Sequence, residues 1–171
     1  MRQAPLRRWK KARDEIRMAV EEKGYDSDRG IFVQSFGSQE LDAAVLLLPT
    51  VDFVPYRDER MVRTADAIRE ELDCNGLVRR YKSKDGLRGR DGPFIACSFW
   101  LAECYSHQDR PEEARAVFDR ALATCNDLGL FSEEYDPDAD EMLGNFPQGL
   151  SHLSHITAAL AIASHRRVVT D

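Results

Sequence analysis

The chain has 171 residues, a size that fits one domain. Hydrophobic residues make up 43% and charged residues 32%, which indicates a folded globular protein rather than a disordered one. The net charge of −6 disfavours general binding to nucleic acid or anionic membranes, and no apolar stretch is long enough to span a bilayer. The basic start has no apolar segment behind it, so we expect no secretory signal and a cytoplasmic location.

Apolar residues recur at helical spacing along most of the chain, which predicts about six helices and little strand. Asp58 and Asp109 precede two of these periodic segments and are predicted to cap them. Residues 40–49 are apolar on nearly all sides and end at Pro49, which is typical of a buried helix. The predicted helices cover residues 6–23, 40–49, 59–72, 93–105, 110–125 and 148–164.

The segments between these helices are long, polar and rich in glycine. Residues 30–37 show an alternating side-chain pattern and are bracketed by Gly30 and Gly37, which favours an extended stretch. Residues 74–93 read as a long loop, and such loops in compact domains are usually functional or disordered. Together the pattern predicts an all-α fold whose helices pair as hairpins.

The four cysteines show no metal-ligand or disulfide pattern. No pair has CxxC spacing and no zinc template fits, so we expect buried, reduced thiols. His152 and His155 lie at i and i+3 on the last predicted helix, a spacing that can contribute to a metal site. No matching carboxylate or cysteine accompanies them, so packing or surface positions are favoured and neither a metal nor another cofactor is predicted. Trp9, Phe99 and Trp100 lie on predicted helices and are expected in the core.

Residues 128–149, "LGLFSEEYDPDADEMLGNFPQG", combine adjacent carboxylates with an apolar approach and a Pro turn. The segment is too apolar at its edges for a solvated tail and too interrupted by Gly and Pro for a helix. Acidic residues are mostly exposed surface charge. The alternative is that Glu133 or Glu134 is presented to a substrate.

Three segments, in this order, resemble the glucoamylases and glucoamylase-like trehalases of glycoside hydrolase family 15. They are "FVQSFGSQELDAAVLLLP", "LVRRYKSKDGLRGRDGPFIACSFWLAECY" and "NDLGLFSEEYDPDADEMLGNFPQGLSH". The resemblance extends from about Trp9 to Ala159 and matches the C-terminal half of the catalytic domain. It implies a twelve-helix (α/α)6 barrel and hydrolysis of an α-glucosidic bond with inversion, and we expect this chain to form about half of that barrel.

The resemblance also implies roles for individual residues. The family's catalytic base is the first acid of the motif that reads "EEYD" here, which makes Glu133 the base and Glu134 a polar, substrate-side neighbour. Arg80 matches an arginine that binds sugar hydroxyls, and planar guanidinium donors suit that task. Ser151 matches a position that hydrogen-bonds the base. Asp91 stands where many bacterial relatives have Glu and is expected near the neighbouring sugar.

Inverting hydrolysis needs a carboxylic acid and a carboxylate base on opposite faces of the sugar, about 6.5–9.5 Å apart. Glu133 and Glu134 are adjacent and are not expected to form that pair. Nothing in residues 1–40 matches the family's general acid. We therefore expect residues 1–171 to be a partial catalytic domain that is inactive alone, and that a separate N-terminal half or self-association would complete.

Two questions stay open from the sequence. The substrate could be an α-1,4-glucan or trehalose. The chain could instead be a non-catalytic helical interaction module that keeps the fold. Residues 113–122, "EARAVFDRAL", do resemble one helix of a tetratricopeptide repeat, but the 34-residue recurrence of that repeat is missing.

Overall fold

Helices account for far more of the described residues than strands do, as the apolar periodicity predicts. The computed structural model describes residues 5–82 and 92–168, with side chains described as far as residue 164. Its helices are α1 (Leu6–Lys23), η1 (Ala43–Leu47), η2 (Pro49–Val51), α2 (Glu59–Glu71), α3 (Ile95–His107), α4 (Pro111–Leu122) and α5 (Gly149–Val168), of which η1 and η2 are 3₁₀ helices. The predicted all-α class is confirmed.

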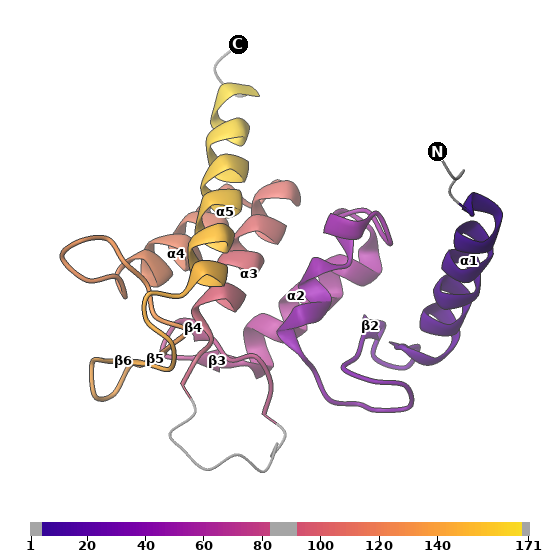
Figure 1. Ribbon diagram of the computed structural model, residues 1–171, viewed down its shortest axis with the longest axis horizontal. Coiled ribbons are helices and arrows are strands. Elements are labelled where there is room, and N and C mark those ends of the chain that lie inside the picture. The colour runs from indigo at the N-terminus through magenta and orange to yellow at the C-terminus, as the bar shows by residue number, and fades with distance from the viewer. Residues whose placement is uncertain (1–4, 83–91, 169–171) are drawn as a thin grey trace.

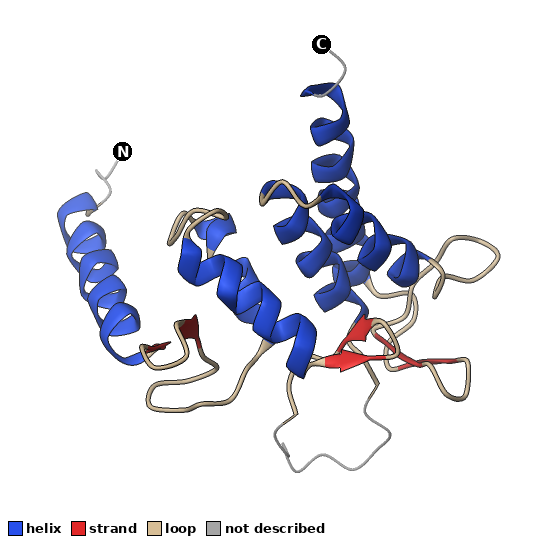
Figure 2. Ribbon diagram, turned by 180° about the vertical axis from the view of Figure 1, so that it is seen from behind, coloured by secondary structure: helices blue, strands red, loops and turns tan. Residues whose placement is uncertain are grey.

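Three short antiparallel hairpins supply the strands in the described part of the chain. They are β1 (Tyr25–Asp26) with β2 (Ile31–Phe32), β3 (Asp73–Cys74) with β4 (Leu77–Val78), and β5 (Glu134–Asp136) with β6 (Glu141–Leu143). The helices lie side by side, and β3 to β6 gather at their lower end (Figure 1). Seen from behind, the same strands again lie together at one end of the helices (Figure 2).

The core is built around α3, which packs against both α4 and α5. Apolar residues surround α3 on all sides, and most of its residues, including Phe99, Trp100 and Leu101, are buried. Phe99 contacts Phe118 of α4 and Phe131 edge to face, with ring centroids 5.5 and 5.4 Å apart. The segment at Glu133 and Glu134 pairs with Phe94 and Ile95, and so lies directly against the start of this covered helix.

The capping predictions have different outcomes. Asp58 caps α2 by accepting a hydrogen bond from the Arg60 backbone N–H at 3.0 Å, as predicted. Asp109 does not cap α4: Arg110 occupies the N-cap position, and Asp109, at a φ of 59°, pairs with Arg57 at 2.6 Å. The left-handed backbone at Asp109 directs its side chain away from the first turn of α4.

Residues 40–49 also differ from the prediction of one buried α-helix. They form η1 and the start of η2, with Asp42 accepting a hydrogen bond from the Ala44 N–H at 2.7 Å. A cap at Asp42 and a proline at residue 49 leave room for little more than one turn, and 3₁₀ geometry is typical of such short pieces.

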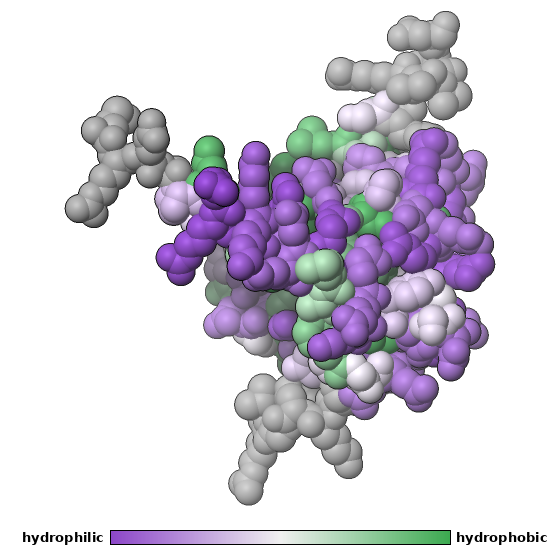
Figure 3. Space-filling model, turned by 90° about the vertical axis from the view of Figure 1, so that its right-hand side faces the viewer, coloured by the Kyte–Doolittle hydropathy of each residue, from purple (hydrophilic) through white to green (hydrophobic). Residues whose placement is uncertain are grey.

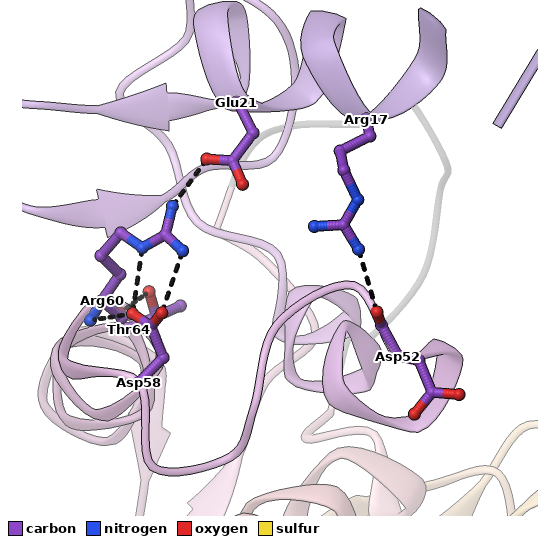
Figure 4. Close-up of polar contacts among 6 residues, drawn as sticks. All are labelled: Arg17, Glu21, Asp52, Asp58, Arg60 and Thr64. Carbon is purple, nitrogen blue, oxygen red and sulfur yellow. Dashed lines mark hydrogen bonds and ion pairs between the residues drawn. The ribbon is translucent and has the colours of Figure 1, made fainter. Parts of the chain in front are cut away.

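The helix α1 is attached by polar contacts and buries none of its residues. Glu21 pairs with Arg60 at 2.6 Å, and Arg17 donates to the Asp52 carbonyl at 3.0 Å (Figure 4). Trp9, expected in the core, is 57% exposed, whereas Phe99 and Trp100 are buried as expected. The surface on this side of the molecule is mostly hydrophilic, with small hydrophobic areas between the charged groups (Figure 3).

Candidate active site

The candidate residues lie next to two hairpins at the same end of the helices (Figure 1). Arg80 comes two residues after β4, and Glu133 immediately precedes β5, which begins with Glu134. The segment at Glu133 is held against the start of α3. The Ile95 N–H donates to the Glu133 carbonyl at 3.0 Å, and Phe94 forms an isolated antiparallel β-bridge with Glu134. The acidic segment is therefore a hairpin fixed to the core helix, where the sequence predicted only a loop.

The Glu133 carboxylate is bound by Asn145, the second residue after β6. Oε2 accepts hydrogen bonds from the Asn145 backbone N–H at 3.1 Å and from Asn145 Nδ2 at 2.8 Å. The Glu133 N–H in turn donates to the Asn145 carbonyl at 2.9 Å. These three bonds fix both the backbone and the carboxylate of Glu133.

The Glu134 carboxylate has a different partner. Its Oε2 accepts a hydrogen bond from the Gly92 N–H at 2.9 Å. The two adjacent carboxylates thus bind backbone on opposite sides of the hairpin segment, Glu133 at residue 145 and Glu134 at residue 92. This divergence agrees with the expectation that they do not act as an acid and base pair.

Arg80 is held by the start of η1 through both its backbone and its side chain. The Ala43 N–H donates to the Arg80 carbonyl at 2.7 Å. Arg80 Nε lies 3.5 Å from Asp42 Oδ2, with the Arg80 side chain half-exposed and that of Asp42 nearly covered. Asp before an apolar run is the usual signal for a capping residue, but nothing in the sequence indicates that Asp42 also pairs with Arg80.

The strands next to Arg80 and Glu134 both contact the start of α3: the Val78 N–H donates to Ser98 Oγ at 2.9 Å, and Phe94 pairs with Glu134. Burial raises the pKa of Cys97 well above its ordinary value, with smaller effects from the charges of Asp42, Arg80 and Glu134. Asp42, Arg80 and Glu134 therefore all act electrostatically on a thiol in the first turn of α3.

Ser151 contacts the backbone next to Glu133, and not the Glu133 carboxylate as expected. It is buried on α5, and its hydroxyl donates to the carbonyl of Ser132 at 2.8 Å. The neighbouring Gln148 N–H donates to the Phe131 carbonyl at 2.9 Å. The Glu133 carboxylate is bound by Asn145, and the first turn of α5 binds the backbone just before Glu133.

The two histidines pack in the aromatic core, as the sequence favoured. His155 lies within 5.5 Å of the rings of Phe99, Phe118 and Phe131. His152 Nε2 accepts a hydrogen bond from the Phe131 N–H at 3.3 Å. Within residues 5–82 and 92–164, no group of three or more His, Cys, Asp or Glu is arranged to hold a metal ion.

The structure does not describe every candidate residue. Asp91 lies outside the described residues. Over the part of the chain that the structure covers, no helix has the length and apolar composition needed to cross a lipid bilayer.

The family model of Glycosyl hydrolases family 15 matches residues 2–160 and so spans all the candidate residues. The chain belongs to glycoside hydrolase family 15. Among curated proteins, this family 15 chain is 45% identical over 157 residues to a trehalase of Thermoplasma volcanium, covering 91% of this chain and 25% of that protein. It is 39% identical over 157 residues to a trehalase of Mycobacterium tuberculosis, covering 90% of this chain and 23% of that protein. The chain thus spans about a quarter of the length of these relatives.

Solved glycosidases share the fold of the family 15 chain. A wild-type glycosidase superposes with a TM-score of 0.77 at 20% identity, covering 90% of this chain and 43% of that one. A variant in complex with glucose gives the same TM-score at 19% identity and the same coverage. The likeness confirms the expected architecture of a partial α/α barrel.

Proposed function

We propose that this chain supplies the general base of an inverting glycosidase that hydrolyses α-glucosidic bonds, with trehalose as the substrate. The observation that carries the proposal is the Glu133 carboxylate, fixed on a hairpin at the base of α3 in a chain 45% identical to a trehalase. Similar proteins from both Thermoplasma and Mycobacterium are named trehalases, which favours trehalose over an α-1,4-glucan.

The proposed reaction uses Glu133 to accept a proton from water. The water oxygen attacks the anomeric carbon as the bond to the leaving sugar breaks, which inverts the configuration at that carbon. The leaving oxygen needs a proton from a carboxylic acid on the opposite face of the sugar. We propose that this acid comes from a second segment with the fold of the preceding half of the barrel.

The other candidate residues have roles in holding the sugar and the base. Arg80, fixed by Asp42, offers guanidinium donors to sugar hydroxyls. Glu134, bound to the Gly92 N–H, lines the same side. Asp91 is proposed to contact the neighbouring sugar, and Ser151 to hold the backbone that carries Glu133.

Exposed apolar side chains indicate where a partner segment would dock. Trp9 and Ile16 of α1 face Val51 and Phe53 across a groove of about 920 Å³. On α5, Leu153, Ile156 and Leu160 remain more than half exposed. We propose that the other half of the barrel, or a second copy of the chain, covers these faces. The four free cysteines support a reducing, cytoplasmic location.

A chimeric enzyme tests the proposal. In the Thermoplasma volcanium trehalase, the 157 residues that match this chain are replaced by it, and trehalose hydrolysis is measured. We expect activity, and we expect Glu133→Gln to lower kcat by about 10²–10⁴-fold because an amide cannot accept the proton. Glu134→Gln is the matched control and should have a smaller effect. A folded chimera in which Glu133→Gln keeps full activity would exclude Glu133 as the base.

The exposed faces of α1 and α5 also favour a second candidate function, that of a non-catalytic helical interaction module. That function predicts a chimera that folds but hydrolyses nothing, together with a chain that associates without binding trehalose. The product's anomeric configuration, followed by NMR in an active chimera, tests inversion separately.

A further inference from the structure

We propose that Asn145 is the positioning residue of Glu133, binding one carboxylate oxygen so that the other receives the proton of the attacking water. The inference rests on the proposed function for its chemistry, whereas the contact itself can be tested without activity. Asn145 lies 12 residues after Glu133, across the β5–β6 hairpin.

The two donors of Asn145 converge on a single oxygen. Its backbone N–H and its Nδ2 group lie 3.1 and 2.8 Å from Glu133 Oε2. Among the described residues, none donates a hydrogen bond to Glu133 Oε1. The two oxygens are therefore distinct, and Oε1 is the one that no described donor occupies.

Gly144 makes this arrangement possible. Its φ is +72°, and a Cβ atom built there would lie 2.9 Å from Glu133 Oε2 and 3.0 Å from Glu133 Cβ. Only the absence of a side chain lets the carboxylate lie against the hairpin backbone at this point. Gly144 and Asn145 together form a cradle for the carboxylate.

The role of the Asn145 side chain can be separated from the folding of the hairpin. The Glu133 N–H donates to the Asn145 carbonyl, and Oε2 accepts from the Asn145 N–H, so both backbone bonds remain in Asn145→Ala. Only the Nδ2 donor is lost. The carboxylate, held by one donor instead of two, then rotates more widely, and a displacement of about 1 Å at a reacting group costs roughly 10²-fold in rate.

The first experiment tests the contact in the chain itself. Selective ¹⁵N labelling of asparagine gives side-chain amide signals from Asn75, Asn126 and Asn145 alone. We expect Glu133→Gln to shift the Asn145 amide signals and to leave the other two pairs in place. Glu134→Gln is the control and should leave all three in place. An Asn145 pair that does not respond to Glu133→Gln would overturn the contact.

The second experiment measures catalysis in the trehalase chimera. We expect Asn145→Ala to lower kcat by about 10–100-fold with KM nearly unchanged, because the base is misplaced while the sugar contacts remain. Asn75→Gly is the matched control: it removes another asparagine amide bound to the same hairpin, at Asp138, and should leave kcat unchanged.

The outcomes separate the two proposals. Loss of activity in Glu133→Gln with full activity in Asn145→Ala would overturn the positioning role and leave the base assignment standing. Full activity in Glu133→Gln would overturn the proposed function, while the amide signals would still decide the contact. A parallel loss of kcat and melting temperature in Asn145→Ala would show a structural role and would also overturn positioning.

Discussion

At Gly92 the backbone passes so close to Tyr135 that no side chain fits. A Cβ atom at residue 92 would lie 2.5 Å from the Tyr135 carbonyl oxygen and 2.9 Å from its carbon. The neighbouring atoms are backbone and cannot rotate away. The same approach allows the Gly92 N–H to reach the Glu134 carboxylate, so this glycine sets the distance between the start of α3 and the acidic hairpin.

Gly92→Ala should therefore be strongly destabilising. Forcing atoms into a packed contact typically costs about 1–3 kcal/mol, and we expect a loss in the upper part of that range, measured by urea unfolding. Gly149→Ala is the control, because nothing lies within 4 Å of a Cβ atom at the start of α5. It should leave stability unchanged or slightly higher. Equal effects of the two substitutions would contradict this account of Gly92.

The sequence singles out Glu133 and Glu134 but not Asn145, whose side chain binds the Glu133 carboxylate. Glu133 and Glu134 stand out because adjacent carboxylates follow an apolar run. Asn145 stands between Gly144 and Phe146, where asparagine is a common turn residue, so its pattern carries no sign of a side-chain contact 12 positions away. Ser151 was predicted to support the base, but only the folded structure shows that it binds the Ser132 carbonyl.

At the scale of elements, α5 and α3 enclose a histidine among phenylalanine rings. His155 stacks on Phe118 at 5.4 Å and meets Phe99 at 5.2 Å. Burial, and then the neighbouring charge of His152, lower the pKa of His155 below its ordinary value of 6.5. The folded protein thus holds this histidine neutral at a pH where the unfolded chain protonates it.

This difference predicts a pH dependence of stability. Above pH 6.5 both states hold His155 neutral, and its effect is constant. Below that value the unfolded chain binds the proton first, so the free energy of unfolding should fall until the lowered folded pKa is reached. Asp58 and Glu113 also have lowered pKa values, but from ordinary values of 3.8 and 4.5, so they act at more acidic pH.

His155→Phe should flatten the curve just below pH 6.5, because phenylalanine does not titrate and fits an aromatic cluster. Denaturant unfolding at a series of pH values measures the effect. An unchanged slope in the variant, or a wild-type curve without any slope in this range, would show that His155 is not held neutral by burial.

Local signals predicted the long helices better than the short elements. The apolar spacing in residues 59–72 and the capping Asp58 correspond closely to α2 (Glu59–Glu71). Residues 40–49 have the composition of a helix, yet the Asp42 cap and Pro49 confine them to 3₁₀ turns. The β5–β6 hairpin was missed because its strands have three residues each, too few to show alternation.

At the scale of the whole molecule, the order of three motifs predicted the fold that the glycosidase structures share. Helical periodicity alone indicates an all-α chain but cannot distinguish part of a barrel from a helical repeat. Nor does it say which apolar face is covered. Trp9 has the spacing of a core residue and is 57% exposed, because α1 meets the rest of the chain through Arg17 and Glu21.

The same exposure predicts that the isolated chain associates with itself. The apolar stripe of α5 leaves Leu153 64%, Ile156 51% and Leu160 63% exposed. Contiguous apolar surface of this kind favours association, because pairing two such faces removes both from water. We expect the average sedimentation coefficient, measured by sedimentation velocity, to increase with protein concentration.

Substitutions on α5 locate the surface responsible. Leu153→Glu combined with Leu160→Glu should shift the chain toward monomer, since pairing would then bury charge. Leu128→Glu is the control: Leu128 is 76% exposed but lies in the loop after α4, away from the stripe. Association that persists in the double variant, or that disappears equally in the control, would assign it to another surface. A wild-type chain that stays monomeric at high concentration would instead show that the α5 stripe does not pair with a second copy. The partner of that face would then be a different polypeptide.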